Sequence, residues 1–201
     1  MLNLGKFLNK KFIFIFIIIL LLIAGGFFWW QGREIKGSPA DYVIKETPEG
    51  KIVENKKAGL IVKIPEGWET QKIELLEGSV ALYTPDVEGV WRNEMINPPL
   101  RKGCAVGGGV IYKKMSFDEI KKEIKEIHAG LGIKSEEFEI ITINNHQALK
   151  DTFDSLSIGP GISVYILNKE KIYNLGVYWA PDDKERCVQE FDKFLETISI
   201  K

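Results

Sequence analysis

The feature that most constrains this chain is a run of 19 residues, Phe12 to Trp30, that contains no charged side chain. As a helix, this run would span about 28 Å, which is close to the thickness of the hydrocarbon core of a bilayer. The run ends in four aromatic residues that suit a membrane interface, and three lysines precede it. We therefore expect a cytoplasmic basic tail at residues 1–11, one transmembrane helix at residues 12–30, and an extracytoplasmic body.

A cleaved signal peptide is the alternative, because Ala24, Gly25 and Gly26 offer the small residues that a signal peptidase requires. The apolar cores of cleaved signals usually measure about 7 to 15 residues. This run is longer and continues into bulky aromatic side chains, so a retained anchor is the favoured interpretation. It predicts a single-pass membrane protein whose partner, through residues 12–30, is the lipid bilayer.

Composition excludes several functional classes. Beyond residue 32 the chain has 24 basic and 28 acidic side chains, so the body lacks the basic footprint of a nucleic-acid-binding protein. Two histidines and two cysteines in the whole chain exclude a His-rich or Cys-rich metal cage. We expect no cofactor and no metal centre.

Residues 31–41 have the glycine and proline content of a linker, and the predicted body covers residues 42–201. The body contains short segments rich in Val, Ile, Tyr and Phe, bounded by turn residues, which is typical of strands. The predicted strands are Tyr42–Glu46, Lys51–Glu54, Leu60–Ile64, Trp68–Leu75, Val80–Thr84, Ala105–Lys113, Phe138–Ile143, Gln147–Phe153, Ile162–Leu167 and Ile172–Trp179. The Asn144-Asn145 pair predicts a tight hairpin, since asparagine tolerates positive φ.

Two amphipathic helices are predicted. The first opens at Ser116 with Glu119 as its capping-box partner and ends at Gly130 and Gly132. Its buried stripe is expected to contain Phe117, Ile120, Ile124, Ile127 and Leu131. The second starts at Pro181 and Asp182, with Glu185 as a candidate capping partner, and its stripe is Val188, Phe191, Leu195 and Ile198, flanked by Phe194. Helices that each bury one face beside antiparallel strands predict an α+β fold, an α/β/α sandwich with a central antiparallel sheet.

Two segments resemble the opening of the PsbP-like domains, the family named for the extrinsic PsbP subunit of photosystem II. They are Leu60-Ile61-Val62-Lys63-Ile64-Pro65-Glu66-Gly67-Trp68 and Val80-Ala81-Leu82-Tyr83-Thr84-Pro85-Asp86. The helix from Ser116, the turn at Ile143–Ala148 and the last helix agree with the resemblance, which covers about residues 58 to 200. It implies the same α/β/α sandwich. Family members include assembly and binding proteins, and no shared catalytic set carries over to these positions.

Cys104 and Cys187 are the first candidate pair. In an exported body two thiols more often form a disulfide than a reactive site, and the alternative is two separately buried thiols. Pairing requires the last helix to pack over the strand that begins near Cys104. Gly107, Gly108 and Gly109 lack the Gly-Lys-Ser/Thr ending of a phosphate loop, so we expect a bulge or a close backbone approach there.

The long segment from Asp86 to Gly103 is the main candidate binding loop, because the ring of Trp91 offers contact area at small entropic cost. The alternative is that Trp91 and Met95 fold back to cap the sheet. The candidate binding residues are Trp91, Arg92 and Met95 in this loop, and Tyr112 in the strand that follows. Residues 155–163 form a second candidate rim, which would border a cleft if both loops lie at one end of the sheet.

Neither histidine predicts a catalytic site. His128 lies beside the apolar stripe of the first helix, and His146 follows a tight turn. Asp151 and Asp154 are near His146 in sequence, but no spacing forces them to converge on it. The leading hypothesis is therefore a membrane-anchored, non-catalytic binding or assembly module with an envelope protein as partner. The alternatives are a receptor for a small ligand or ion and, last, an envelope hydrolase.

Overall fold

The computed structural model describes residues 35–73, 79–89, 99–155 and 159–201. The predicted anchor at residues 12–30 lies outside them. Among the described residues, no helix combines the length and the apolar character that crossing a bilayer requires. Residues Ile35 to Lys201 form one compact unit. This unit starts ahead of the predicted boundary at residue 42, because Ile35 and Lys36 already pair with Tyr112 and Ile111.

Twelve strands and two α-helices are present among the described residues. The strands are β1 (Ile35–Lys36), β2 (Tyr42–Thr47), β3 (Gly50–Asn55), β4 (Leu60–Lys63), β5 (Glu69–Ile73), β6 (Ser79–Tyr83), β7 (Cys104–Tyr112), β8 (Lys134–Ile143), β9 (His146–Asp154), β10 (Gly161–Asn168), β11 (Lys171–Trp179) and β12 (Ser199–Ile200). The helices are α2 (Phe117–Leu131) and α3 (Lys184–Glu196), and short 3-10 turns cover Pro39–Asp41 and Pro181–Asp183.

The strands form two antiparallel sheets, where the sequence predicts one. The larger sheet has the order β5-β6-β7-β11-β10-β9-β8, with β1 paired to β7. The second sheet has the order β12-β4-β3-β2, because β4 pairs with β3 on one side and with the C-terminal β12 on the other. Buried residues of both sheets, among them Val53, Val62, Val106 and Leu175, belong to one hydrophobic core. The second sheet is therefore an additional wall of the same core.

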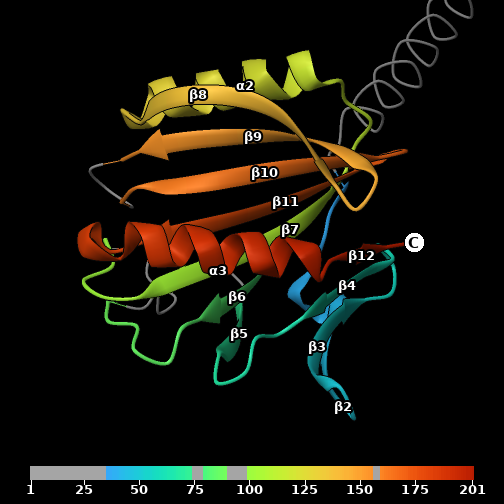
Figure 1. The fold of residues 1–201 in the computed structure, drawn as a ribbon. Helices are drawn as coiled ribbons and strands as arrows, with labels where there is room; N and C mark the ends of the chain where they lie inside the picture. Colours follow the sequence, from blue (N-terminus) through green and yellow to red (C-terminus); the bar gives the residue numbers. More distant parts are fainter. Residues whose placement is uncertain (1–34, 74–78, 90–98, 156–158) are drawn as a thin grey trace, which may run out of the picture. The chain divides into compact units, whose positions relative to one another are not determined.

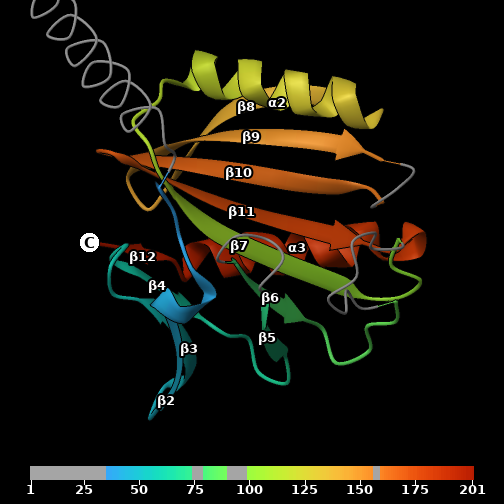
Figure 2. The same cartoon turned by 180° about the vertical axis from the view of Figure 1, so that it is seen from behind.

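The two helices cover opposite faces of the larger sheet, as the predicted sandwich requires. Successive strand residues point to opposite faces, and in β9 Ala148 belongs to the main core whereas Leu149 packs in a cluster with Ile120 and Ile124 of α2. Helix α3 lies in front of the sheet in Figure 1 and behind it in Figure 2, and α2 does the reverse. The structure is thus an α+β fold dominated by antiparallel strands.

Local signals at α2 behave as expected, but its buried stripe is shorter than predicted. Ser116 and Glu119 form the capping box, and Gly132 ends the helix with φ of 66° while Gly130 remains inside it. Ile120 and Ile124 are buried, whereas Ile127 and Leu131 are 57% and 63% exposed. The prediction that the last two are buried was wrong, because helical periodicity identifies a face but not how far the sheet extends beneath it.

Helix α3 packs more apolar surface than its predicted stripe. Cys187, Phe191, Phe194 and Leu195 are all buried, so Phe194 is a core residue and not a flank. The preceding 3-10 turn Pro181–Asp183 separates the predicted start from the helix itself, and the cap residue Asp183 makes no side-chain capping bond. Its carboxylate instead accepts a hydrogen bond from the Gly103 amide.

Candidate functional site

Three of the four predicted binding residues, Trp91, Arg92 and Met95, lie outside the described residues. The fourth, Tyr112, ends β7, and the candidate loop ends at Gly103, just before β7 begins. Nine residues of extended strand place the two ends of β7 about 26 Å apart. The structure therefore does not bring Tyr112 to the end of the sheet at which that loop returns.

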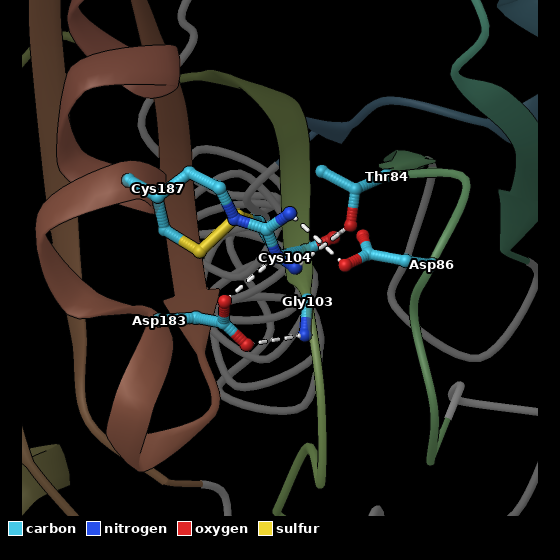
Figure 3. Close-up of polar contacts among 7 residues, drawn as sticks. Thr84, Asp86, Gly103, Cys104, Asp183 and Cys187 are labelled. Carbon is cyan, nitrogen blue, oxygen red and sulfur yellow. Dashed lines mark hydrogen bonds and ion pairs between the residues drawn. A yellow bond between two sulfur atoms is a disulfide. The ribbon is translucent and has the colours of Figure 1, made fainter.

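A disulfide and a polar network define the end of the sheet at which the loop returns (Figure 3). Cys104 and Cys187 are joined, with their Cα atoms 5.5 Å apart, and so α3 does pack over the start of β7. The Asp183 carboxylate accepts a hydrogen bond from the Gly103 amide at 2.8 Å. Thr84 Oγ1 accepts a hydrogen bond from the Cys104 amide at 3.0 Å. The start of α3 is thus joined to β7 by one covalent bond and by the Asp183 contact.

Arg186 connects this network to the segment that follows β6. Its guanidinium lies 2.9 Å from an Asp86 carboxylate oxygen and 2.8 Å from an Asp183 carboxylate oxygen. The hydrogen bond from Arg186 lowers the pKa of Asp86, so this carboxylate is ionised at neutral pH. Arg186 therefore clamps the start of the candidate loop to α3, and the network is a structural brace.

The described ends of the two candidate loops meet at this same end of the sheet. A Cβ placed on Gly159 would lie 3.6 Å from Cβ of Pro99. Gly159 also takes φ of 87°, and its amide donates to the Ser155 carbonyl at 2.8 Å. From the sequence, these two loops were expected to border a cleft only if both lie at one end of the sheet, and Pro99 and Gly159 do lie together there.

The glycine run of β7 is a close-approach site. Gly107, Gly108 and Gly109 keep regular register with β6 and β11, so no bulge occurs there. A Cβ on Gly108 would lie only 2.6 Å from Cδ2 of Leu175, whereas a Cβ on Gly107 would meet no described atom within 4 Å. Gly108 is needed for packing of the core.

The buried carboxylate of Asp151 pairs with His128 and not with His146. His128 Nε2 of α2 lies 3.6 Å from Asp151 Oδ2 of β9, and the His128 ring packs 5.6 Å from the Phe153 ring. The sequence did not predict this pair, because α2 crosses back over β9 and brings residue 128 to residue 151. Among the described residues no cluster of three or more His, Cys, Asp or Glu side chains could hold a metal ion. The pair fastens α2 to the sheet.

An open groove of about 770 Å³ lies between the second sheet and α3. We call it the Trp68 groove. Its lining residues are Glu49, Gly50, Lys51, Lys63, Ile64, Pro65, Glu66, Gly67, Trp68, Glu190, Lys193, Phe194 and Thr197. Gly67 takes φ of 79° and the Trp68 amide donates to the Pro65 carbonyl, so this turn returns a partly buried tryptophan to the core. The charged rim has three acidic and three basic side chains around an apolar floor.

A second cavity, of about 300 Å³, is strongly basic. Four lysines line it, against one glutamate, and we call it the lysine pocket: Lys56, Lys57, Lys171 and Lys201, with Glu54. Lys57 Nζ lies 4.9 Å from the centre of the Tyr112 ring. Burial raises the pKa of Tyr112. Sequence reasoning missed this pocket because its lysines come from three separate segments with no shared motif.

No family model and no curated protein matches the sequence. Several solved structures are similar in fold. LpqN of Mycobacterium tuberculosis, a protein involved in cell envelope biogenesis, is 9% identical with a TM-score of 0.50, and the match covers 71% of this chain and 83% of LpqN. The cyanobacterial PsbP (CyanoP) of Synechocystis sp. PCC 6803 is 8% identical, with a TM-score of 0.49 and 81% and 94% of the two chains covered.

PA94 of Pseudomonas aeruginosa, a protein of unknown function, is 12% identical with a TM-score of 0.48, and the match covers 80% of this chain and 97% of that one. At sequence identities this low, structural similarity is evidence about the fold alone. The LpqN match supports the α+β sandwich. Membership of the PsbP-like family stays a prediction.

Proposed function

We propose that this protein is a membrane-tethered, non-catalytic binding module, in which residues 12–30 anchor the chain and the body engages an envelope protein outside the bilayer. The observation that carries the proposal is the Trp68 groove, which offers a large open surface with an apolar floor and a charged rim. A groove of this kind suits a polypeptide segment, because a polypeptide supplies apolar side chains and both signs of charge together.

The composition of the groove favours a peptide over a small apolar ligand. Ile64 and Phe194 are buried beneath it, and Trp68 forms part of its wall. Lys193 and Glu190 pair at 3.1 Å on the α3 side, and Lys51 lies on the hairpin side. Tryptophan is enriched among the residues that contribute most to binding at protein interfaces, and charged side chains are typical of the surrounding rim.

Two independent features support the proposal that the body lies on the extracytoplasmic side of the membrane. Lysines precede the apolar run, as the positive-inside rule expects for a cytoplasmic N-terminus. The body also carries the Cys104–Cys187 disulfide, and such bonds persist in oxidising compartments. LpqN, which has a similar fold, is a protein involved in cell envelope biogenesis, and this agrees with an envelope role.

Site-specific photo-crosslinking in intact cells tests the proposal. A photoreactive amino acid would replace Lys51 or Lys193 in the groove, and Lys122 on the exposed face of α2 as the matched control. We expect both groove positions to form an adduct with the same envelope protein, while position 122 does not. Adducts of equal yield at all three positions, or none at either groove position, would refute the groove as the binding surface.

The tether is tested separately by alkaline carbonate extraction of membranes. An integral anchor keeps the protein in the membrane pellet, and deletion of residues 12–30 should release it. Recovery of the intact chain in the soluble fraction would refute the tether regardless of the crosslinking result.

A further inference from the structure

The lysine pocket lies at the point where the chain enters the folded body. Ile35 of β1 pairs with Tyr112, and Lys57 Nζ sits over the Tyr112 ring. Lys57 also lies 3.9 Å from Asp41, just after β1. Both views show the blue segment of residues 35–41 on the same side of the molecule as β12 and the C-terminus (Figure 2).

The turn that presents two of the lysines is held from several directions. The buried Asn55 side chain accepts a hydrogen bond from the Ala58 amide at 3.0 Å. The Ala58 carbonyl accepts hydrogen bonds from Tyr173 Oη at 2.6 Å and from Lys171 Nζ at 2.9 Å. The Gly59 carbonyl accepts one from the Lys201 amide at 3.0 Å. Residues of β11 and the C-terminal segment therefore fix the position of Lys56 and Lys57 before any ligand arrives.

The charge of the pocket is unusual for this body. Beyond residue 32 acidic side chains outnumber basic ones by 28 to 24, yet the pocket has four lysines and one glutamate. Glu54 forms an ion pair with Lys45, which lowers the pKa of Glu54 and offsets its charge, and Asp41 offsets part of the charge of Lys57 in the same way. Lys171 uses two of its three donors on the Lys57 and Ala58 carbonyls, so one donor remains for a ligand among these described contacts.

Chain length brings this pocket to a bilayer if residues 12–30 are the anchor. Four residues, 31–34, separate Trp30 from Ile35. Five residue steps span at most about 18 Å even when fully extended. The end of the sheet that bears β1 and Tyr112 is therefore confined close to the lipid headgroups, where phosphate groups are abundant.

We propose that the lysine pocket binds the phosphate of an anionic lipid headgroup in the bilayer that anchors the chain. This rests on the proposed tether and adds a second contact with the membrane. Clustered lysines attract phosphate as point charges, and juxtamembrane basic clusters bind anionic lipids in this way. The contact holds the domain in one orientation on the membrane surface.

Lysine footprinting of the full chain in nanodiscs tests the proposal. The chain is placed in nanodiscs of neutral phosphatidylcholine or in nanodiscs that also contain the anionic lipid phosphatidylglycerol. Lysines are then acylated with a neutral reagent at about 0.15 M ionic strength. At this ionic strength the Debye length is about 8 Å, so long-range attraction is screened. We expect Lys56, Lys57 and Lys171 to react at least about fivefold more slowly in the anionic nanodiscs. Lys122 on α2 is the internal control and should react at the same rate in both.

Two further arms identify the ligand and the site. Millimolar inorganic phosphate added to neutral nanodiscs should give no protection, whereas equal protection by free phosphate would overturn the lipid assignment. The double variant Lys56→Gln/Lys57→Gln should remove the protection of Lys171, and Lys121→Gln/Lys122→Gln, in another lysine-rich surface, should leave it intact. Unprotected pocket lysines in a chain that stays with the nanodisc would overturn this proposal alone. A chain that does not stay with the nanodisc refutes the tether as well.

Discussion

Reduction of the Cys104–Cys187 disulfide should cost a large part of the stability of the body. The two residues are 83 positions apart. In the chain-entropy model, closing a loop of this length stabilises the folded state by about 4.5 kcal/mol at 25 °C. Domains of this size are stable by only about 5–15 kcal/mol in total, so the reduced protein keeps a much smaller margin. Both cysteines are fully buried in the disulfide-bonded form.

Urea unfolding of the oxidised and reduced chain, each monitored by tryptophan fluorescence, measures this difference directly. With an m value of about 2 kcal/mol per M, the midpoint should fall by about 2 M on reduction. Arg186→Gln in the oxidised protein is the control, since it removes a brace at the same joint and keeps the covalent bond. A midpoint that falls by less than about 0.5 M on reduction would show that the unfolded-state argument fails for this chain.

Three further predictions follow from described contacts. Burial raises the pKa of all six tyrosines, and that of Tyr42, Tyr83, Tyr173 and Tyr178 to about 12. Folding therefore favours neutral phenols, and the stability this gives is complete below the unfolded pKa of about 10 and is lost as the pH rises towards 12. Phenolate absorbance should show that these four tyrosines do not titrate near pH 10 before unfolding, and four phenolates forming near pH 10 in the folded protein would contradict their burial. Since Arg186 lowers the pKa of Asp86, the stability from that pair is present above the unfolded pKa of about 3.9 and lost as pH falls below it. The urea midpoints of the wild type and Arg186→Gln should therefore converge below that pH, and a constant gap would contradict the pairing. Gly108→Ala should cost about 1–3 kcal/mol through its clash with Leu175, whereas Gly107→Ala should be close to neutral by the same urea assay; equal losses would refute the close-approach argument.

Sequence patterns predicted the elements whose causes are local. The Ser116–Glu119 capping box acts within four residues, and Asn144 and Asn145 take φ of 46° and 68° in the predicted hairpin. β1 and β12 have two residues each and no periodicity, and they exist only because distant strands accept them as partners. The sequence did not predict these two strands, because they are stabilised by pairing with strands that are distant in the chain.

The site residues show the same limit more sharply. Cys104 and Cys187 could be proposed as partners without any knowledge of the fold, because the sequence has only two cysteines and so allows only one intramolecular pairing. The sequence assigned no partner to Asp151, because its contact with His128 depends on how α2 packs on the sheet. The lysine pocket needed the turn after β3, the start of β11 and the C-terminal residue to converge, and each of these lysines taken singly is an ordinary surface residue.

The sequence prediction placed Tyr112 in one candidate binding site with the loop that contains Trp91, but the structure places Tyr112 at the other end of β7 from where that loop returns. Trp91 and Tyr112 were grouped as candidate binding residues, but Tyr112 lies beside the lysine pocket, while Cys104 at the other end of β7 lies where the loop containing Trp91 returns. If the lysine end contacts lipid headgroups, the strand carries the disulfide end up to about 26 Å further from the bilayer. That end would be open to partners in the aqueous phase. The Cys104–Cys187 disulfide there holds the start of α3 against β7 without support from the membrane.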